Sequence, residues 1–274
     1  MTLISLLLVL ALERSTRKTR YWQSEFYLGQ YFQFLHSRGW LNEQSNLIGI
    51  ALIVILPALV LGGLVYSLDA FLVEFLLNTA VLMVCIGCPR FRDSYRGYLQ
   101  AASRGDTEAT HLYAEQLGYP CDSQNSFGQC LVWINYRHYI AVSLWFVAFG
   151  GAGAVFYVLT RAMLAHLSEQ QSALHSQWQK MMQAVDWIPA RLASLGLLVV
   201  GHFSRALPVW LGFAFDLSTP ARRLITDVAK AAEYVEDDKV TCTDEPCTMV
   251  RLVKRNMMLL LVVVAVLTLS GMLR

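Results

Sequence analysis

Residues 47–88, LIGIALIVILPALVLGGLVYSLDAFLVEFLLNTAVLMVCIGC, decide the fold class of this chain. The run from Leu47 to Leu68 holds no charged residue, and the run from Ala70 to Cys88 holds only Glu74. Each run is long enough to cross a bilayer, because a membrane-spanning helix needs about 20 apolar residues. Since lipid offers the backbone no hydrogen bonds, only the turn at Asp69 can lie outside the membrane. The stretch therefore predicts a helical transmembrane hairpin over residues 47–88.

The composition extends this prediction to the whole chain. The sequence is 55% hydrophobic and 15% charged, whereas an ordinary soluble domain carries about a quarter charged residues. Two further runs, Tyr139–Leu159 and Met257–Leu273, are apolar and uncharged. We expect an all-α polytopic membrane protein with four transmembrane helices and up to six, together with amphipathic cytoplasmic or interfacial helices.

Three segments leave alternatives open. Residues 1–12 are apolar but short, and they lack the basic start and cleavage site of a signal peptide, so we expect a short membrane helix. Residues 139–159 cross the membrane or, because of the run Gly150-Gly151-Ala152-Gly153, turn back within it. Residues 193–215 are either a span or a re-entrant segment. They carry Arg205, which we expect to face protein or water, because an ionisable side chain at mid-depth seldom faces lipid.

Basic residues predict the orientation of the N-terminal half. Arginine and lysine are concentrated in residues 13–46 and again in residues 89–138. The positive-inside rule places both stretches in the cytoplasm of a bacterial inner-membrane protein, with Asp69 on the outer side. Beyond Leu159 the charge counts do not decide, so the side of residues 160–256 stays open.

The polar segments are expected to belong to one membrane domain over residues 1–274. Aromatic and basic residues are mixed after the first helix, as is typical of the headgroup level. We expect Pro189 to end one helix and open the next, and Thr219-Pro220 to begin another. The predicted segments are interfacial (13–46), cytoplasmic helical (89–138), amphipathic helix (160–192), helical loop (216–256) and C-terminal transmembrane (257–273).

Few residues suggest covalent or metal chemistry. The net charge of +2 gives no reason to expect nucleic-acid binding, and the six histidines lack the close spacing of a zinc motif. Cys85 and Cys88 form a C-x-x-C inside an apolar run, where packing is favoured over a redox role. Whether Cys242 and Cys247 pair depends on the side of the membrane on which they lie, and this stays open.

Several motifs, in a fixed order, resemble a known family. They are SRGDTE (103–108), LWF (144–146), GGAGA (150–154) and DWIPARL (186–192). In this order they resemble the CobD/CbiB family of membrane cobalamin-assembly enzymes. Within that family, the chain is most similar to a regulatory branch, whose members take part in β-lactamase induction. The features that carry this similarity are the start Met1-Thr2-Leu3, the stretch CLVWINYR (130–137) and the chain length.

The resemblance also indicates what the chain lacks. Enzymes of the family carry acidic motifs on both sides of the glycine-rich segment, and the matching positions here are Ile134, Asn135, His138 and Tyr139, then Arg161, Ala162, Met163 and Leu164. Carboxylates at such positions would hold Mg²⁺ for an ATP-dependent reaction. Their loss favours a non-catalytic, regulatory or sensory protein that modulates β-lactamase induction or an envelope response. The alternative is a membrane enzyme or carrier that acts on an amphiphilic or lipid-linked substrate.

The expected site is a binding site with no catalytic residue, no metal and no cofactor. The partners that we expect are membrane lipids and either a protein partner or an amphiphilic ligand, bound at the cytoplasmic helical face. Nucleic acid is not expected, and the oligomeric state stays open. The candidate binding residues are Asn135, Arg137, His138, Arg161, Trp187, Arg191, His202 and Arg205.

Overall fold

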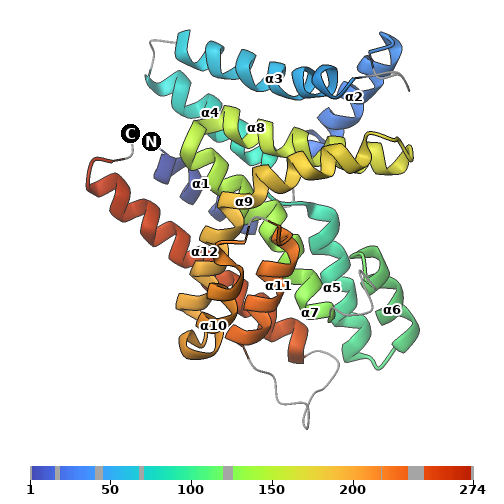
Figure 1. The fold of residues 1–274 in the computed structure, drawn as a ribbon, viewed down its shortest axis with the longest axis vertical. Helices are drawn as coiled ribbons and strands as arrows, with labels where there is room; N and C mark the ends of the chain where they lie inside the picture. Colours follow the sequence, from blue (N-terminus) through green and yellow to red (C-terminus); the bar gives the residue numbers. More distant parts are fainter. Residues whose placement is uncertain are drawn as a thin grey trace. The chain divides into compact units, whose positions relative to one another are not determined.

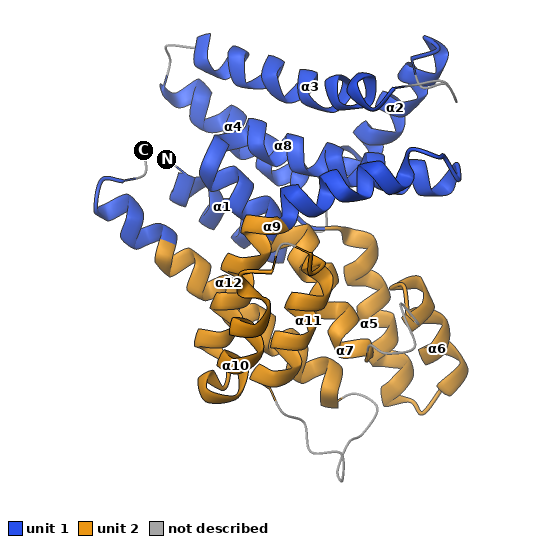
Figure 2. Ribbon diagram, in the orientation of Figure 1, with its two compact units in different colours: residues 1–87, 141–186, 264–274 blue, residues 88–140, 187–263 orange. Residues whose placement is uncertain are grey.

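The computed structural model describes residues 2–15, 19–40, 46–67, 71–119, 126–216, 218–233 and 244–272. All secondary structure in these ranges is helical, which confirms the all-α prediction. The chain divides into two compact units (Figure 2). Unit 1 contains residues 1–87, 141–186 and 264–274, and unit 2 contains residues 88–140 and 187–263.

Unit 1 is built around the long helix α8 (Ala141–Glu169). The two apolar helices of the predicted hairpin, α3 (Leu47–Ser67) and α4 (Phe71–Cys85), both pack against α8 (Figure 1). The predicted turn at Asp69 lies outside the described residues. The short N-terminal membrane helix predicted over residues 1–12 corresponds to α1 (Thr2–Ser15), which packs against α4 and α8.

A second core of unit 1 joins α2 (Ser24–Ser37) and the start of α9 (His175–Val200) to α3 and α8. The buried Trp178 is its largest side chain, and it donates a hydrogen bond from Nε1 to the carbonyl of Thr160 at 3.0 Å. The hydroxyl of Tyr31 on α2 donates to the carbonyl of Ile53 on α3 at 2.8 Å. The buried apolar side chains of this core are Leu35, Ile50, Val54, Leu159, Met163, Leu167 and Trp178.

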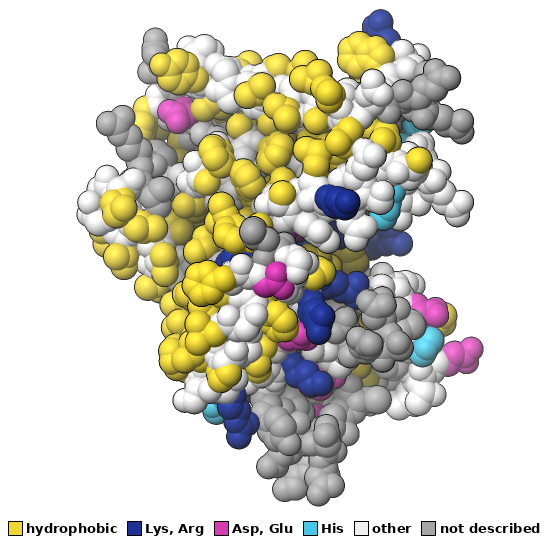
Figure 3. Space-filling view, viewed as in Figure 1, with side chains coloured by type: hydrophobic (Ala, Val, Ile, Leu, Met, Phe, Trp, Pro, Cys, Tyr) yellow, Lys and Arg dark blue, Asp and Glu magenta, His cyan; other side chains and the backbone are white. Residues whose placement is uncertain are grey.

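The apolar helices carry their hydrophobic side chains outward as well as inward. On α3, Ile48, Leu59 and Val60 are well exposed, and Figure 3 shows hydrophobic side chains spread over this helix. In the described residues, four helical stretches are long and apolar enough to cross a membrane. They are α3, the joined stretch α7–α8 (127–169), α9 and α12 (Asp244–Leu269), and α4 with α5 forms a fifth that is bent by 45°. The chain is a multi-pass membrane protein.

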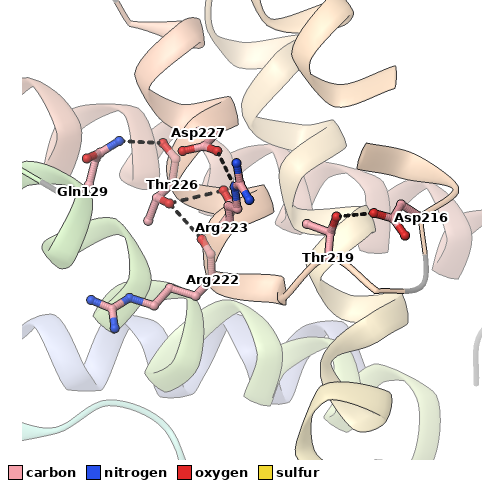
Figure 4. Close-up of polar contacts among 7 residues, drawn as sticks. All are labelled: Gln129, Asp216, Thr219, Arg222, Arg223, Thr226 and Asp227. Carbon is pink, nitrogen blue, oxygen red and sulfur yellow. Dashed lines mark hydrogen bonds and ion pairs between the residues drawn. The ribbon is translucent and has the colours of Figure 1, made fainter. Parts of the chain in front are cut away.

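Unit 2 contains shorter helices. They are α5 (Pro89–Ser103), α6 (Thr107–Gln116), α7 (Phe127–Asn135), a π-helical turn η2 (Tyr136–Ile140), α10 (Phe203–Ala214) and α11 (Ala221–Ala232), with parts of α9 and α12. A capping box between Ser126 and Gln129 begins α7. The side chain of Gln129 also donates to the carbonyl of Thr226 at 3.2 Å, which ties α7 to α11 (Figure 4).

The segment before α11 is held by hydrogen bonds to Asp216. Asp216 accepts hydrogen bonds from the hydroxyls of Thr219 and Ser218, both at 2.7 Å, and from the Ser218 amide at 2.9 Å. The predicted helix start at Thr219-Pro220 is confirmed, because α11 begins at Ala221. The hydroxyl of Thr219, however, binds Asp216 and does not cap the helix.

The predicted amphipathic helix over residues 160–192 is two helices. α8 ends at Glu169, and a turn with Gln171 at φ 48° leads into α9. The apolar periodicity survives the turn, because Leu167 and Trp178 pack into the same core from both sides of it. Periodicity alone therefore could not detect this turn.

Pro189 was predicted to separate two helices, and this prediction is wrong. The residue lies inside α9, which continues to Val200. Proline in a helix interior removes one hydrogen bond and costs about 3 kcal/mol. Pro189 and its neighbour Ala190 are buried, so their packing contributes to offsetting that cost.

The apolar run 193–215 is divided at Gly201. α9 ends at Val200 and α10 begins at Phe203, while the amide of His202 donates to the carbonyl of Ala232 at 2.7 Å. A Cβ on Gly201 would lie 2.7 Å from the side chain of Ala232, so glycine permits this close approach. Arg205 is exposed on the first turn of this separate, short helix, and the expectation that it faces protein or water instead of lipid stays a prediction.

The C-terminal helix is longer than the predicted span over residues 257–273. α12 begins at Asp244, inside the segment predicted as a helical loop. The buried Asn256 donates from Nδ2 to the carbonyl of Ala193 at 3.0 Å. A Cβ on Gly196 would collide with Asn256, so a glycine on α9 makes room for this polar contact.

Candidate functional site

The glycine run in α8 contains a break in the helix. Gly150 has φ 64° and ψ −152°, a backbone conformation that is essentially restricted to glycine. The amide of the next residue, Gly151, donates to Oδ1 of Asn78 on α4 at 3.0 Å. Because of the break, the Gly151 amide does not follow the regular hydrogen-bond pattern of the helix. The side chain of Asn78 on α4 accepts its hydrogen bond instead.

The break divides α8 into a first arm (141–149) and a second arm (151–169) that pack together near the bend. The rings of Trp145 and Phe156 meet edge to face with centroids 5.3 Å apart. In a straight helix, residues eleven positions apart are separated by about 16 Å along the axis. A Cβ on Gly153 would collide with the carbonyl of Trp145. Residues 139–159 are therefore not one straight transmembrane helix.

A cavity of about 700 Å³ lies at this bend, and we call it the bend cavity. It is bordered by the end of the first arm and by α1, α3 and α4, all within unit 1. Its lining comprises Thr2, Ser5, Gly62, Val65, Tyr66, Phe71, Glu74, Phe75, Asn78, residues 146–152 and Met272.

Helices α1 and α4 supply polar side chains to the bend cavity. Glu74 and Asn78 are one helical turn apart on α4, so they lie on the same face. Ser5 on α1 is hydrogen-bonded to Thr79 of α4 at 2.9 Å. The buried hydroxyl of Thr2 has no hydrogen-bond partner among the described residues. The bend cavity thus offers carboxylate, amide and hydroxyl groups to a ligand.

The charge of the bend cavity is one-sided. Glu74 is acidic, and none of the described lining residues is Lys, Arg or His. The first arm ends and the second arm begins at the bend, so the negative end of one helix dipole and the positive end of another both lie there. Because the charged side chain of the described lining is Glu74, the lining favours a cationic group or a hydrogen-bond donor.

Three of the predicted site residues lie together in unit 2. Asn135 ends α7, and Arg137 and His138 follow in the π-helical turn η2. The guanidinium of Arg137 lies 5.6 Å from the ring centroid of Trp133, and the ring of His138 meets Phe91 edge to face at 4.8 Å. Single π-helical turns are frequent at functional sites, so a binding role for these residues stays a prediction.

Trp187 and Arg191 make contacts that hold two helices together. The guanidinium of Arg191 lies 4.1 Å from the ring centroid of Trp187. It also donates to the carbonyls of Ala214 and Asp216, both at 2.6 Å, at the end of α10. These carbonyls are the negative end of the α10 dipole, so the contacts give Arg191 a structural role in fixing α10 to α9.

The remaining predicted residues do not join one cluster. Arg161 lies half-buried on the second arm of α8 in unit 1. His202 precedes α10, and its backbone, as described above, bonds the end of α11. Arg205 follows on α10. Among the described residues, no three His, Cys, Asp or Glu side chains are grouped so that they could hold a metal ion.

The comparisons with known proteins identify the family. A family model described as "Regulatory signalling modulator protein AmpE" matches residues 1–274. The chain belongs to the AmpE family. Protein AmpE of Shigella flexneri is 30% identical over 287 residues, which cover 99% of this chain and 99% of that protein. No solved structure matches the chain.

The AmpE family match confirms the predicted regulatory branch, and the chain is a regulatory membrane protein. The wider resemblance to cobalamin-assembly enzymes stays a prediction. Cys85, Cys88 and Cys247 form no disulfide, and Cys242 lies outside the described residues.

Sequence reasoning missed most of the bend cavity. The glycine run predicted a possible break, and Glu74 was noted as the one charge in its run. Asn78, however, drew no attention, although it is an amide in an apolar run that also holds Glu74. An amide four residues after a carboxylate in such a run is the signal that could have located the site.

Proposed function

We propose that this AmpE-family protein is a regulator in the bacterial inner membrane that responds to a ligand bound in the bend cavity, without covalent catalysis. The observation that carries this proposal is the broken helix α8, held by Asn78 at the border of the cavity. Backbone that leaves the helical pattern within a membrane is tolerated where it is buried in protein or lines a cavity. Broken helices form the ligand sites of many membrane transporters, which supports a binding role here.

The lining indicates the chemistry of the ligand. The carboxylate of Glu74 suits an amine or another cationic group, and Asn78 adds a polar amide one helical turn away. Aromatic rings of Tyr66, Phe71 and Phe149 border the same space, and such rings attract cations while packing against apolar surface. We expect an amphiphilic ligand with a cationic head.

The regulated process is β-lactamase induction or a related envelope response, as the resemblance implied. A protein partner is expected at the cytoplasmic helices of residues 89–138. In this account the ligand alters the regulatory output, and the chain performs no reaction on it.

The test fills the bend cavity and measures induction. Ala148 lines the bend cavity and is exposed, so Ala148→Phe adds bulk there without entering a packed core. Ala165→Phe is the matched control, because Ala165 is exposed on the same helix but lies outside the cavity lining. In cells that lack the native copy, the Ala148→Phe protein should fail to restore regulated β-lactamase induction while Ala165→Phe restores it.

The amounts of both variants in the membrane must be equal for this comparison. Normal induction with Ala148→Phe at equal abundance would contradict the proposal.

A further inference from the structure

The side chain of Arg222 in unit 2 is held in an unusual state. Its Nε and Nη2 atoms are buried and have no hydrogen-bond partner in the part of the chain that the structure describes. The neighbouring Arg223 is exposed and lies 3.6 Å from the carboxylate of Asp227. Figure 4 shows Arg223 directed toward Asp227, while the guanidinium of Arg222 points away from both.

A guanidinium in this state is costly. Arginine stays protonated in proteins, and leaving a buried charged donor unsatisfied costs more than leaving a neutral one. Folding alone gives no reason to bury these two nitrogens without an acceptor. A group that supplies oxygen acceptors to Arg222 would remove the cost.

The start of α11 adds a second reason to expect an anion. Arg222 is the second residue of this helix, and the residue before the helix, Pro220, provides no side-chain hydrogen bond to its first turn. The nearby Asp216, Ser218 and Thr219 bind one another instead. The first amides of a helix and the positive end of its dipole bind anions, and phosphate is a common one.

We propose that Arg222, with the first turn of α11, binds an anionic group with phosphate-like oxygens. Guanidinium binds such oxygens through two parallel hydrogen bonds, which a carboxylate or phosphate matches in geometry. The group belongs either to a soluble anion or to the headgroup of an anionic lipid. The site uses no residue of the bend cavity, so it is independent of the function proposed above.

The experiment measures the melting temperature of the purified full-length protein. The reference state is a maltoside detergent, which contains no phosphate. In the first arm, inorganic phosphate is added to the protein in this detergent. In the second arm, the protein in nanodiscs of phosphatidylglycerol is compared with the protein in nanodiscs of a neutral glycolipid. The variants are Arg222→Gln and the matched control Arg223→Gln, whose side chain is exposed on the same helix.

A saturating anion should raise the melting temperature of the native protein and of Arg223→Gln by about 5 °C or more. Arg222→Gln should show no such rise. A response to inorganic phosphate identifies a soluble anion, and a response to phosphatidylglycerol alone identifies a lipid headgroup. No response in either arm, or an equal response in Arg222→Gln, would overturn the proposal.

A second measurement separates binding from structure. Without any anion, Arg222→Gln should be at least as stable as the native protein, because it removes a charged group that has two buried nitrogens without an acceptor. A lower melting temperature for Arg222→Gln under these conditions would mean that the guanidinium is itself structural, and this too would overturn the proposal.

Discussion

At the scale of single residues, Arg191 connects two helices through one side chain. It donates to the carbonyls of Ala214 and Asp216 and lies against the ring of Trp187. Hydrogen bonds from a charged donor contribute about 1.5 to 3 kcal/mol. The contacts explain the arginine of the DWIPARL motif by helix packing, without a ligand.

Replacing Arg191 should therefore lower stability. We expect Arg191→Ala to lose about 2 kcal/mol, measured by chemical denaturation in detergent micelles. Arg191→Lys should recover only part of the loss, because an ammonium lacks the planar fork that reaches several carbonyls and stacks on a ring. Equal stability of all three proteins would contradict this role.

Asp216 should give a pH-dependent contribution to stability. Its pKa is lowered from 3.8 to about 2 by the hydroxyl of Thr219, then by the hydroxyl and amide of Ser218. Because the pKa in the folded protein lies below the ordinary value, this contribution is complete above about pH 5 and is lost as the pH falls through about 2.

The comparison with Asp216→Asn isolates this group from the other acids. The melting temperature of the native protein should exceed that of Asp216→Asn at neutral pH, and the difference should shrink between about pH 5 and pH 2. A difference that is independent of pH, or that grows on acidification, would show that the hydrogen bonds of Asp216 do not depend on its charge.

At the scale of elements, the bend in α8 depends on the conformation of Gly150. An added Cβ would have room, since its nearest neighbour is Oδ1 of Asn78 at 3.5 Å, but φ 64° is strained for any other residue. We expect Gly150→Ala to lower the free energy of unfolding by about 2 kcal/mol. Thermal unfolding of the purified protein measures this.

Gly29 provides the matched control. It lies inside α2 with nothing within 4 Å of an added Cβ and has no positive φ. Gly29→Ala should leave stability unchanged or raise it by about 0.5 to 1 kcal/mol, because alanine is the better helix former. If both substitutions have the same effect, backbone strain at Gly150 does not hold the bend.

Some features of the helices could be predicted from the sequence, and others could not. Long apolar runs without charge, such as α3, were predictable because bilayer thickness sets their length. The break at Gly150 was foreseen as one of two alternatives, but the break at Gly201 was not predicted and the break expected at Pro189 is absent. Pro189 lies within a continuous helix, whereas Gly201 ends one, because the outcome depends on packing against residues distant in sequence, such as Ala232.

The candidate site was less predictable than the fold. The bend cavity combines α1, α3, α4 and α8, and no spacing along the chain indicates that Asn78 and Gly151 are partners. The residues selected from motifs, such as Arg191, proved to make helix contacts. Motifs identified the family because they preserve the scaffold, and for the same reason they did not locate the cavity.

At the scale of the whole molecule, the charge pattern predicts the orientation in the membrane. The basic stretch of residues 89–138 should be cytoplasmic, and the end of α3 should be on the outer side. Ser67 and Ser103 are both exposed at helix ends. A membrane-impermeant thiol reagent applied to intact cells should label Ser67→Cys but not Ser103→Cys, and the reverse pattern would contradict the orientation.

The central claim is that a ligand in the bend cavity controls regulation. It is tested most directly by blocking the bend cavity after the protein has folded. Cells carrying Ala148→Cys are treated with a small membrane-permeant thiol reagent, and β-lactamase induction is measured before and after. The unsubstituted protein and Ala165→Cys receive the same treatment, to control for the native cysteines. We predict that modification of Ala148→Cys alone abolishes regulation, whereas full regulation after complete modification of Ala148→Cys would contradict the account.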